Sequence, residues 1–166
     1  MMIRNVCLED AAAIAHIYSY FVENTNITFE TESPTPAEMA QRIRTYTVRF
    51  PYLVMEEDGK VIGYAYASSF KSRAAYSRTV ELAIYFHHDY CGKGRGRLLL
   101  TALLDALKTY PHIYTAIACI YHPNPPSEKL FQSFGFQRIG IAPNVGYKNN
   151  TWLSTVDYVL PLRPYD

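Results

Sequence analysis

Alternating glycines interrupt residues 90–100, at the point where a strand-like segment gives way to an apolar helical pattern. Residues 79–86 before them read T-V-E-L-A-I-Y-F, which is typical of a buried strand. Glycines allow tight backbone turns and let main-chain N–H groups approach a ligand closely. A helix that begins there adds unpaired N–H donors and the positive end of its dipole. The chain must therefore contain a strand–loop–helix unit, and this unit is suited to the phosphates of a nucleotide-like cofactor.

The loop alternates glycines with cations: Gly92, Lys93, Gly94, Arg95, Gly96 and Arg97. No Lys-Ser or Lys-Thr pair closes it, which argues against a P-loop NTPase. The G-x-G-x-x-G spacing of dinucleotide-binding folds is also absent, and more than half of the chain precedes the loop, whereas that fingerprint sits on the first strand. Taken alone, the loop could equally be a solvated basic turn.

The chain has 166 residues, which predicts one domain spanning residues 1–166. Its net charge of +1 favours neither nucleic acid nor a membrane surface as a partner. Cys7, Cys91 and Cys119 are widely spaced, so we expect reduced thiols and a cytoplasmic protein. No run of residues approaches membrane-spanning length.

The order of expected elements indicates an α+β fold with a mixed central sheet. Asp58-Gly59 predicts a hairpin turn, Thr35 with Glu38 predicts a capping box, and Asn124 predicts a helix cap. The expected strands are residues 3–6, 52–57, 60–67, 79–86, 114–120, 136–140 and 151–162. The first expected helix follows residues 9–10, the next two span residues 36–49 and 97–109, and the last begins after Asn124 and ends before Gly135.

This element order, with a glycine loop after the fourth strand and Gly135-Phe136 after a later helix, resembles the GCN5-related N-acetyltransferases (the GNAT family). The resemblance implies the GNAT fold, in which the fourth and fifth strands splay to form a cofactor cleft for acetyl-CoA. The family loop reads Arg/Gln-x-x-Gly-x-Gly/Ala. Gly94 and Gly96 match it, whereas Cys91 stands where Arg or Gln is usual.

Within that family, residues 71–81 (K-S-R-A-A-Y-S-R-T-V-E) resemble the corresponding segment of the phosphinothricin acetyltransferases and their methionine sulfoximine or sulfone relatives. Residues 18–32 resemble their first helix and the loop after it. Gly146, Lys148 and Trp152 resemble their carboxy-terminal motif, although Ser154 stands where an acidic residue often follows. The resemblance covers nearly the whole chain.

The implied chemistry centres on Glu81, a carboxylate in an apolar strand. Burial would raise its pKa toward that of a general base, and the resemblance assigns it that role, directly or through water. A wet-face carboxylate or a pair with Arg73 or Arg78 is the structural alternative. The resemblance also implies that the pantetheine arm pairs with the backbone of Ile84, Tyr85 and Phe86, and that Asn124 contacts the arm or the thioester.

Many family members carry a tyrosine whose hydroxyl protonates the departing thiolate, and here Phe131 occupies that position. Water, another tyrosine such as Tyr121, or a helix N-terminus must then serve the thiolate.

Substrate recognition is assigned to the cationic loop and two aromatic residues: Phe29, Lys71, Arg73, Tyr76 and Arg78. An arginine fork there could hold a carboxylate, and a solvated loop is the alternative. The histidines show no metal spacing, so no metal is expected. The resemblance also implies a homodimer.

We therefore expect an acetyl-CoA-dependent N-acetyltransferase that acts on the amino group of a small amino-acid-like compound, of the phosphinothricin, methionine sulfoximine or methionine sulfone type. A polyamine or a peptide N-terminus is an alternative substrate. Because Cys91 and Phe131 depart from the family pattern, a non-catalytic acyl-CoA sensor is a further alternative.

Overall fold

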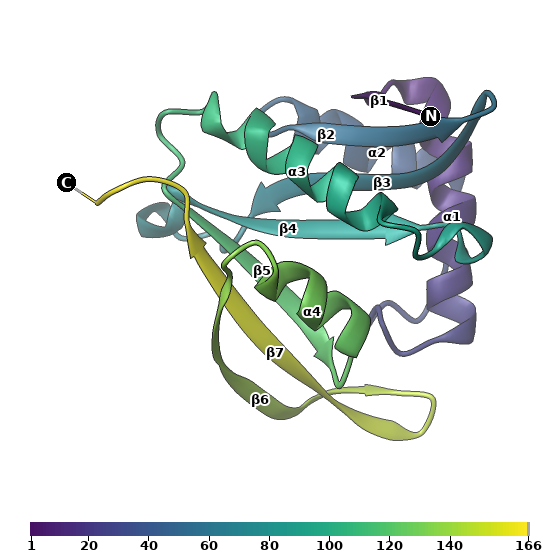
Figure 1. Ribbon diagram of the computed structural model, residues 1–166. Coiled ribbons are helices and arrows are strands. Elements are labelled where there is room, and N and C mark those ends of the chain that lie inside the picture. The colour runs from purple at the N-terminus through teal and green to yellow at the C-terminus, as the bar shows by residue number, and fades with distance from the viewer. Residues whose placement is uncertain (166) are drawn as a thin grey trace.

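The computed structural model describes residues 1–165, which form a twisted sheet with helices on both faces (Figure 1). The elements follow the order β1 (Met2–Asn5), α1 (Ala11–Asn24), α2 (Pro36–Thr47), β2 (Tyr52–Glu57), β3 (Lys60–Ser69), β4 (Thr79–Phe86), α3 (Arg95–Lys108), β5 (Thr115–His122), α4 (Pro125–Gln132), β6 (Gln137–Lys148) and β7 (Thr151–Pro161). Short 3₁₀ turns lie at η1 (Leu8–Asp10), η2 (Ala74–Tyr76) and η3 (His88–Tyr90).

The described strands form one mixed sheet in the order β1-β2-β3-β4-β5-β7-β6. The β4–β5 pair is parallel and the other neighbours are antiparallel. α3 supplies the crossover that a parallel pair requires. This arrangement confirms the expected mixed α/β fold.

Each face of the sheet has its own apolar core. On one face, side chains of β2, β3, β4 and β5 pack with α3 and α4, with Leu99, Leu103 and Val80 fully buried. On the other face, α1 and α2 pack against the alternate residues of β2 and β3, with Ile14 and Val54 fully buried. Strand alternation therefore decides which side of the sheet each residue of β4 serves.

The local sequence signals that predicted turns and helix starts are confirmed. The Thr35 hydroxyl accepts a hydrogen bond from the N–H of Glu38 at 3.2 Å, and the Glu38 carboxylate accepts one from the N–H of Thr35 at 2.7 Å. Asp58 and Gly59 both have positive φ, as a two-residue hairpin turn between β2 and β3 requires.

Many boundaries differ from expectation by one or two residues, and two differences have a clear physical reason. α3 begins at Arg95 and not at residue 97, because Gly94 in a left-handed conformation serves as its N-cap. β6 runs through Lys148, well beyond residue 140, where the expected strand ended. Its pairing with β7 shifts register twice, and its side chains are mostly exposed, so the apolar alternation that signals a strand is lost.

The fold leaves an opening between β4 and β5. The two strands pair only over residues 79–81 and 115–117, where Glu81 lies opposite Ile117. Beyond that point they diverge (Figure 1), so the edge of β4 that faces β5 has no strand partner. This confirms the expected splay. Among residues 1–165, no helix is long and apolar enough to cross a membrane.

Candidate active site

The glycine loop forms a cradle at the N-terminus of α3. Gly92, Lys93 and Gly94 have φ values of 82°, 53° and 76°, so three successive residues are left-handed. The N–H groups of Gly96 and Arg97 fall in the first helical turn, where no intrahelical acceptor exists. A Cβ built on Gly92 or Gly94 would meet no atom within 4 Å. The space in front of these backbone donors is therefore open to an anion.

The cations of the loop differ in where their side chains point. Arg95 pairs with Glu57 of β2 at 2.8 Å, and its guanidinium lies 5.4 Å from the Tyr90 ring centroid. Arg97 lines the groove beside the loop and donates a hydrogen bond to the hydroxyl of Ser133 at 3.1 Å. Of the three loop cations, Arg97 lines the groove and Lys93 and Arg95 do not, while Lys129 of α4 is a further cation in its lining.

This groove has a volume of about 430 Å³ and extends from the glycine loop to the splayed strands. Its floor includes the three β4 residues expected to meet a pantetheine arm, Ile84, Tyr85 and Phe86. Asn124 lies on the opposite wall at the start of α4, where its side-chain oxygen accepts a hydrogen bond from the N–H of Ser127 at 3.5 Å. Asn124 therefore caps a helix and lines the groove at once.

A second cavity of about 230 Å³ adjoins the groove and contains Glu81. The two spaces share wall residues: Ile27, Ile84, Tyr85, Asn124 and Ser127. Because β4 and β5 separate after Glu81, the second cavity reaches through the sheet from the α3/α4 face to the α1/α2 face. A molecule bound along the groove would thus end within reach of the Glu81 carboxylate.

Glu81 is half-buried and has no charged partner of opposite sign among the residues that line its cavity. Burial raises the pKa of Glu81, and the negative charge of Asp157 on β7 adds to that rise. The alternative considered for Glu81, a pair with Arg73 or Arg78, does not form among residues 1–165, and neither arginine lines this cavity. A carboxyl group with a raised pKa at the end of a groove is a stronger proton acceptor than an exposed glutamate.

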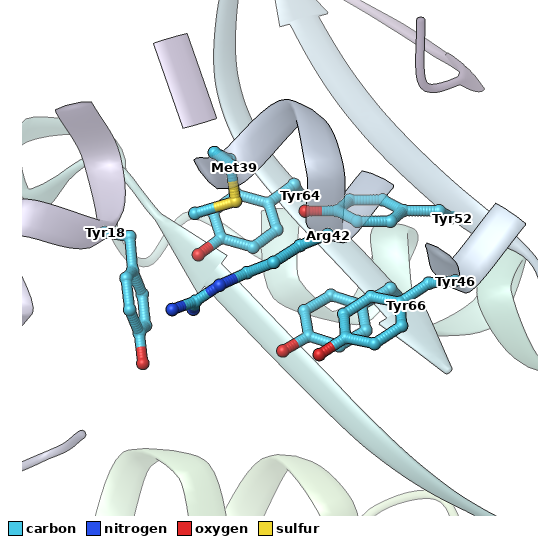
Figure 2. Close-up of a pocket in the computed structure, with 7 residues that line it drawn as sticks. All are labelled: Tyr18, Met39, Arg42, Tyr46, Tyr52, Tyr64 and Tyr66. Atoms are coloured by element: carbon cyan, nitrogen blue, oxygen red, sulfur yellow. The ribbon is translucent and has the colours of Figure 1, made fainter. Parts of the chain in front are cut away.

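A tyrosine cluster covers the α1/α2 face beside Glu81. Figure 2 shows the Arg42 side chain of α2 reaching toward Tyr18, with the rings of Tyr46 and Tyr66 stacked together nearby. Tyr18 and Tyr66 line both this small cavity, of about 10 Å³, and the cavity of Glu81. The guanidinium of Arg42 is held by Glu30 through two hydrogen bonds of 2.7 and 2.9 Å. The cluster forms a rigid aromatic wall.

The loop between α1 and α2 closes the cavity from the other side. Lys148 of β6 is buried and donates hydrogen bonds to the carbonyl groups of Thr25 and Thr28 at 2.9 and 3.0 Å. Phe29 packs on Gly146, where an added Cβ would lie 2.5 Å from its ring, and its centroid is 6.4 Å from that of Tyr121. Phe29 therefore lies behind Tyr121, which lines the Glu81 cavity.

The cationic loop predicted to hold a substrate lies apart from both cavities. Lys71, Arg73 and Arg78 are exposed, and none of them lines the groove or the cavity of Glu81. The Lys71 ammonium lies 5.1 Å from the ring centroid of Tyr76, and the Arg78 guanidinium lies 5.2 Å from that of Tyr114. Within one described chain, these residues form a separate surface next to the start of β4.

Phe131 is buried in the core against Phe136, with ring centroids 5.1 Å apart, and its edge reaches the Glu81 cavity. It offers no hydroxyl there. Tyr121 and Ser127 line the same cavity, and Ser127 lies in the first turn of α4. Both therefore place at the cavity a hydroxyl group that Phe131 lacks.

His87, His88 and Asp89 bring their ligand atoms within 4.8 Å of one another just before the loop. The N–H of Asp89 donates to Nδ1 of His87 at 3.3 Å, and the two imidazoles stack at 4.4 Å. Hydrogen bonding and ring stacking within this turn therefore explain why the three side chains lie close together.

Several residues of the cavity were not anticipated from the sequence: Tyr18, Ile27, Tyr66, Cys119 and Ser127. The positions of Cys119 and Tyr121 could be predicted from the sequence, because these residues alternate with the buried residues of β5 and so lie on the same face of the sheet as Glu81. Tyr18 and Ile27 depend on the packing of α1 and its loop against the sheet, which periodicity alone does not reveal.

A glycine loop that opens into a splayed sheet, with a carboxyl group at the end of the groove, is the arrangement expected of an acyltransferase. The Acetyltransferase (GNAT) domain family matches residues 3–156. The chain belongs to this GNAT acetyltransferase family, and its fold is the GNAT fold.

Relatives named for the compounds that they acetylate are similar to this chain over most of its length. Phosphinothricin N-acetyltransferase of Streptomyces viridochromogenes is 34% identical over 98% of this chain and 90% of that protein. The L-methionine sulfoximine/L-methionine sulfone acetyltransferase of Salmonella typhimurium is 35% identical over 92% of this chain and 90% of that protein. The crystal structure of a phosphinothricin acetyltransferase from Sinorhizobium meliloti with acetyl-CoA superposes with a TM-score of 0.92, at 37% identity over 96% of this chain and 87% of that one.

Proposed function

We propose that the protein transfers the acetyl group of acetyl-CoA to the amino group of a small amino-acid-like substrate. The observation that carries this proposal is the continuity of the two spaces, because the groove of the glycine loop and the cavity of Glu81 share Ile84, Tyr85 and Asn124 as walls. The end of this continuous space at the glycine loop suits a phosphate-bearing acyl donor. The other end holds the Glu81 carboxyl group, which can accept a proton.

The residues of the groove fit coenzyme A. The N–H groups of Gly96 and Arg97, which have no intrahelical acceptor in the first turn of α3, suit its pyrophosphate, and the space around Gly92 and Gly94 is open. The unpaired edge of β4 suits the amide groups of pantetheine, which would pair with Ile84, Tyr85 and Phe86 as an added strand. Acetyl-CoA supplies the acetyl group as a thioester when it is bound, and N–H groups of this edge would polarise the thioester carbonyl.

Glu81 is the proposed general base. An ammonium group must lose a proton before its nitrogen can attack the thioester, and Glu81 faces the cavity where the amine would lie. Burial raises the pKa of Glu81, which makes the carboxylate a stronger base than an exposed glutamate. The transferred proton breaks one N–H bond and forms one O–H bond on Glu81, directly or through one water molecule.

The departing thiolate lacks the usual tyrosine, and we assign its protonation to Tyr121. This hydroxyl lines the Glu81 cavity, and the first turn of α4 adds the positive end of a helix dipole near Ser127. Tyr121→Phe is expected to lower kcat while acetyl-CoA affinity is retained. An unchanged kcat would assign the proton to water.

The names of the relatives support an amino-acid-like substrate of the phosphinothricin or methionine sulfoximine type. The exposed Lys71, Arg73 and Arg78 would hold a substrate carboxylate only if they face the cavity of a second subunit, because they lie outside the cavity of their own chain. Neither Phe29 nor Tyr76 lines the cavity of its own chain. Phe29 would act on the substrate through Tyr121, and Tyr76, which lies beside Lys71, would contact the substrate only from a second subunit.

A homodimer is consistent with that requirement. The hairpin of β6 and β7 exposes large apolar side chains on one edge of the sheet: Ile139, Ile141, Val145, Tyr147 and Trp152. Contiguous exposed apolar surface of this kind marks an interface. Sedimentation of the purified protein should give a dimer, Trp152→Glu should give a monomer, and a monomeric parent protein would contradict the assembly. The three free thiols support a cytoplasmic location.

The test of the proposed function is thiol release from acetyl-CoA with four substrate groups: amino acids, amino-acid sulfoximines or sulfones with phosphinothricin, polyamines, and peptides. Turnover should be fastest with the amino-acid-like group. Preference for polyamines or peptides would replace the substrate assignment. Binding of acetyl-CoA without turnover on any amine would instead identify an acyl-CoA sensor.

A further inference from the structure

Two carboxyl groups and one thiol, those of Glu81, Asp157 and Cys119, lie on the same face of the sheet. Glu81 lies opposite Ile117 in the β4–β5 pair, and Cys119 lies opposite Asp157 in the β5–β7 pair. Side chains alternate along a strand, so Cys119 projects to the same side as Ile117 and Glu81, and Asp157 projects to the same side as Cys119. The thiol of Cys119 lines the Glu81 cavity.

Asp157 carries a polar atom that the rest of the fold leaves unsatisfied. Among residues 1–165, Oδ1 of Asp157 and Nε of Arg163 are the buried side-chain polar atoms without a hydrogen-bond partner. Burying an unpaired carboxylate oxygen lowers stability. Such a group is expected where function requires it.

Cys119 of β5 lies directly across from Asp157 of β7 and lines the Glu81 cavity. Burial raises the pKa of the Cys119 thiol to about 12, and the negative charges of Asp157 and Glu81 contribute to that rise. The thiol therefore stays protonated near neutral pH and adds no charge to the site. The charge that this residue pair brings beside the cavity is the Asp157 carboxylate.

The groups that face Glu81 contain no compensating cation. The titratable residues from the neighbouring elements are Tyr18 of α1, Tyr66 of β3, Tyr85 of β4, Cys119 and Tyr121 of β5, and Asp157 of β7. No lysine, arginine or histidine lines the cavity within the described residues. Asp157 is therefore the charge that acts on Glu81 from behind the thiol.

We propose that Asp157 is a positioning residue for Glu81, a fixed negative charge behind Cys119 that favours proton uptake by Glu81 during acetyl transfer. This inference rests on the proposed role of Glu81 as base. Two carboxylates repel each other while both are ionised, and the repulsion is relieved when Glu81 takes the proton of the amine. This repulsion is relieved as the proton moves to Glu81. The relief therefore lowers the free-energy barrier of acetyl transfer and not only the free energy of the bound substrate.

The first test measures the ionisation of Glu81 in the free enzyme, by carbon NMR of protein labelled at glutamate side-chain carboxyl groups. Its signal is assigned by its loss in Glu81→Gln. In Asp157→Asn the titration midpoint of Glu81 should move to lower pH, and in Asp157→Glu, which keeps the charge, it should stay near that of the parent. An unmoved midpoint in Asp157→Asn would overturn the inference.

The second test reads catalysis and uses the same variants. In Asp157→Asn the acid limb of kcat/KM should move to lower pH, with a fall in the plateau of at least about threefold, and Asp157→Glu should restore most of the loss. A uniform fall at every pH would indicate a structural role only. If Glu81→Gln were fully active, the proposed base would be wrong, whereas the NMR midpoint reports on Asp157 independently.

A third readout guards against misfolding. In a Cys7→Ser, Cys91→Ser background, iodoacetamide reports Cys119 alone. Loss of the Asp157 charge should increase alkylation at pH 8.5 at least about fivefold, because more of the thiol ionises. Asp157→Glu should react as slowly as the parent, and equal acceleration in both variants would contradict the account.

Discussion

The buried ammonium group of Lys148 donates a hydrogen bond to the main-chain carbonyl of Thr28 at 3.0 Å, across 120 residues of sequence. A second bond to the carbonyl of Thr25 measures 2.9 Å. Burial lowers the pKa of Lys148, and the two carbonyl groups satisfy the charge that the fold encloses. The bonds connect β6 to the α1–α2 loop, which places Ile27 where the groove meets the Glu81 cavity.

Lys148→Met should loosen this loop. The variant keeps the stem of the side chain but leaves two carbonyl groups without a donor, which costs about 2–4 kcal/mol of stability. KM for the amine should rise several-fold, measured with saturating acetyl-CoA. Lys108→Met is the matched control, because its ammonium is exposed and pairs only with Asp105. Equal effects of the two variants would show that Lys148 does not hold the loop.

Gly94→Ala should weaken acetyl-CoA binding at least about tenfold by calorimetry, because Gly94 lines the groove and an added Cβ strains a residue with φ of 76° that shapes the loop. Gly59→Ala controls for strain, since its φ of 75° and open surroundings are the same in a remote hairpin turn. Cys91→Ala should have little effect, because the binding groups belong to the backbone. A loss in Cys91→Ala as large as that in Gly94→Ala would contradict this view.

The loop cations should separate in their effects. Arg97→Gln should weaken acetyl-CoA binding about three- to tenfold and reduce its salt dependence, because its guanidinium lines the groove. Arg95→Gln should leave affinity nearly unchanged and lower the melting temperature instead, through loss of the ion pair with Glu57. Calorimetry at two salt concentrations and thermal unfolding distinguish them. Reversed effects would mean that Arg95 is the phosphate contact.

Much of the fold could be predicted from local chemistry. The Thr35–Glu38 capping box, the Asp58-Gly59 turn and the Asn124 cap are each decided by a few neighbouring residues, and all of them form. β6 could not be predicted in full, because its register shifts and its exposed edge remove the alternation on which strand prediction depends.

The site was predictable along β4 and its loop, and at Asn124, whose cap signal marks the start of α4. Glu81, Ile84 and the glycine loop follow one another in sequence, so a single strand and its turn bring them together. Asp157 and Cys119 reach Glu81 only through strand order, with β7 beside β5 and β5 beside β4. Lys71, Arg73 and Arg78 are close to Glu81 in sequence, yet the turn at η2 directs them elsewhere. Nearness in sequence does not decide which face a side chain serves.

Glu81 should also affect stability in a pH-dependent way. Burial raises its pKa above the ordinary value of 4.5, so the folded state binds this proton more tightly than the unfolded state. Stability attributable to Glu81 therefore falls as pH rises from about 4.5 through the raised value, and it stays lost above it. Urea unfolding from pH 4 to pH 8 should show less decline in Glu81→Gln than in the parent. A steeper decline in the variant would mean that Glu81 is stabilised as an anion.

The central claim, that Glu81 takes the proton of the amine in a cavity continuous with the acetyl-CoA groove, is tested most directly by kcat/KM against pH for Glu81→Gln. The preferred substrate of the parent is used, and acetyl-CoA affinity is measured in parallel. We predict a loss of about 10²- to 10⁴-fold near neutral pH, partial recovery at high pH where the free amine is abundant, and unchanged acetyl-CoA affinity. A pH profile identical to that of the parent, at equal affinity, would contradict the account.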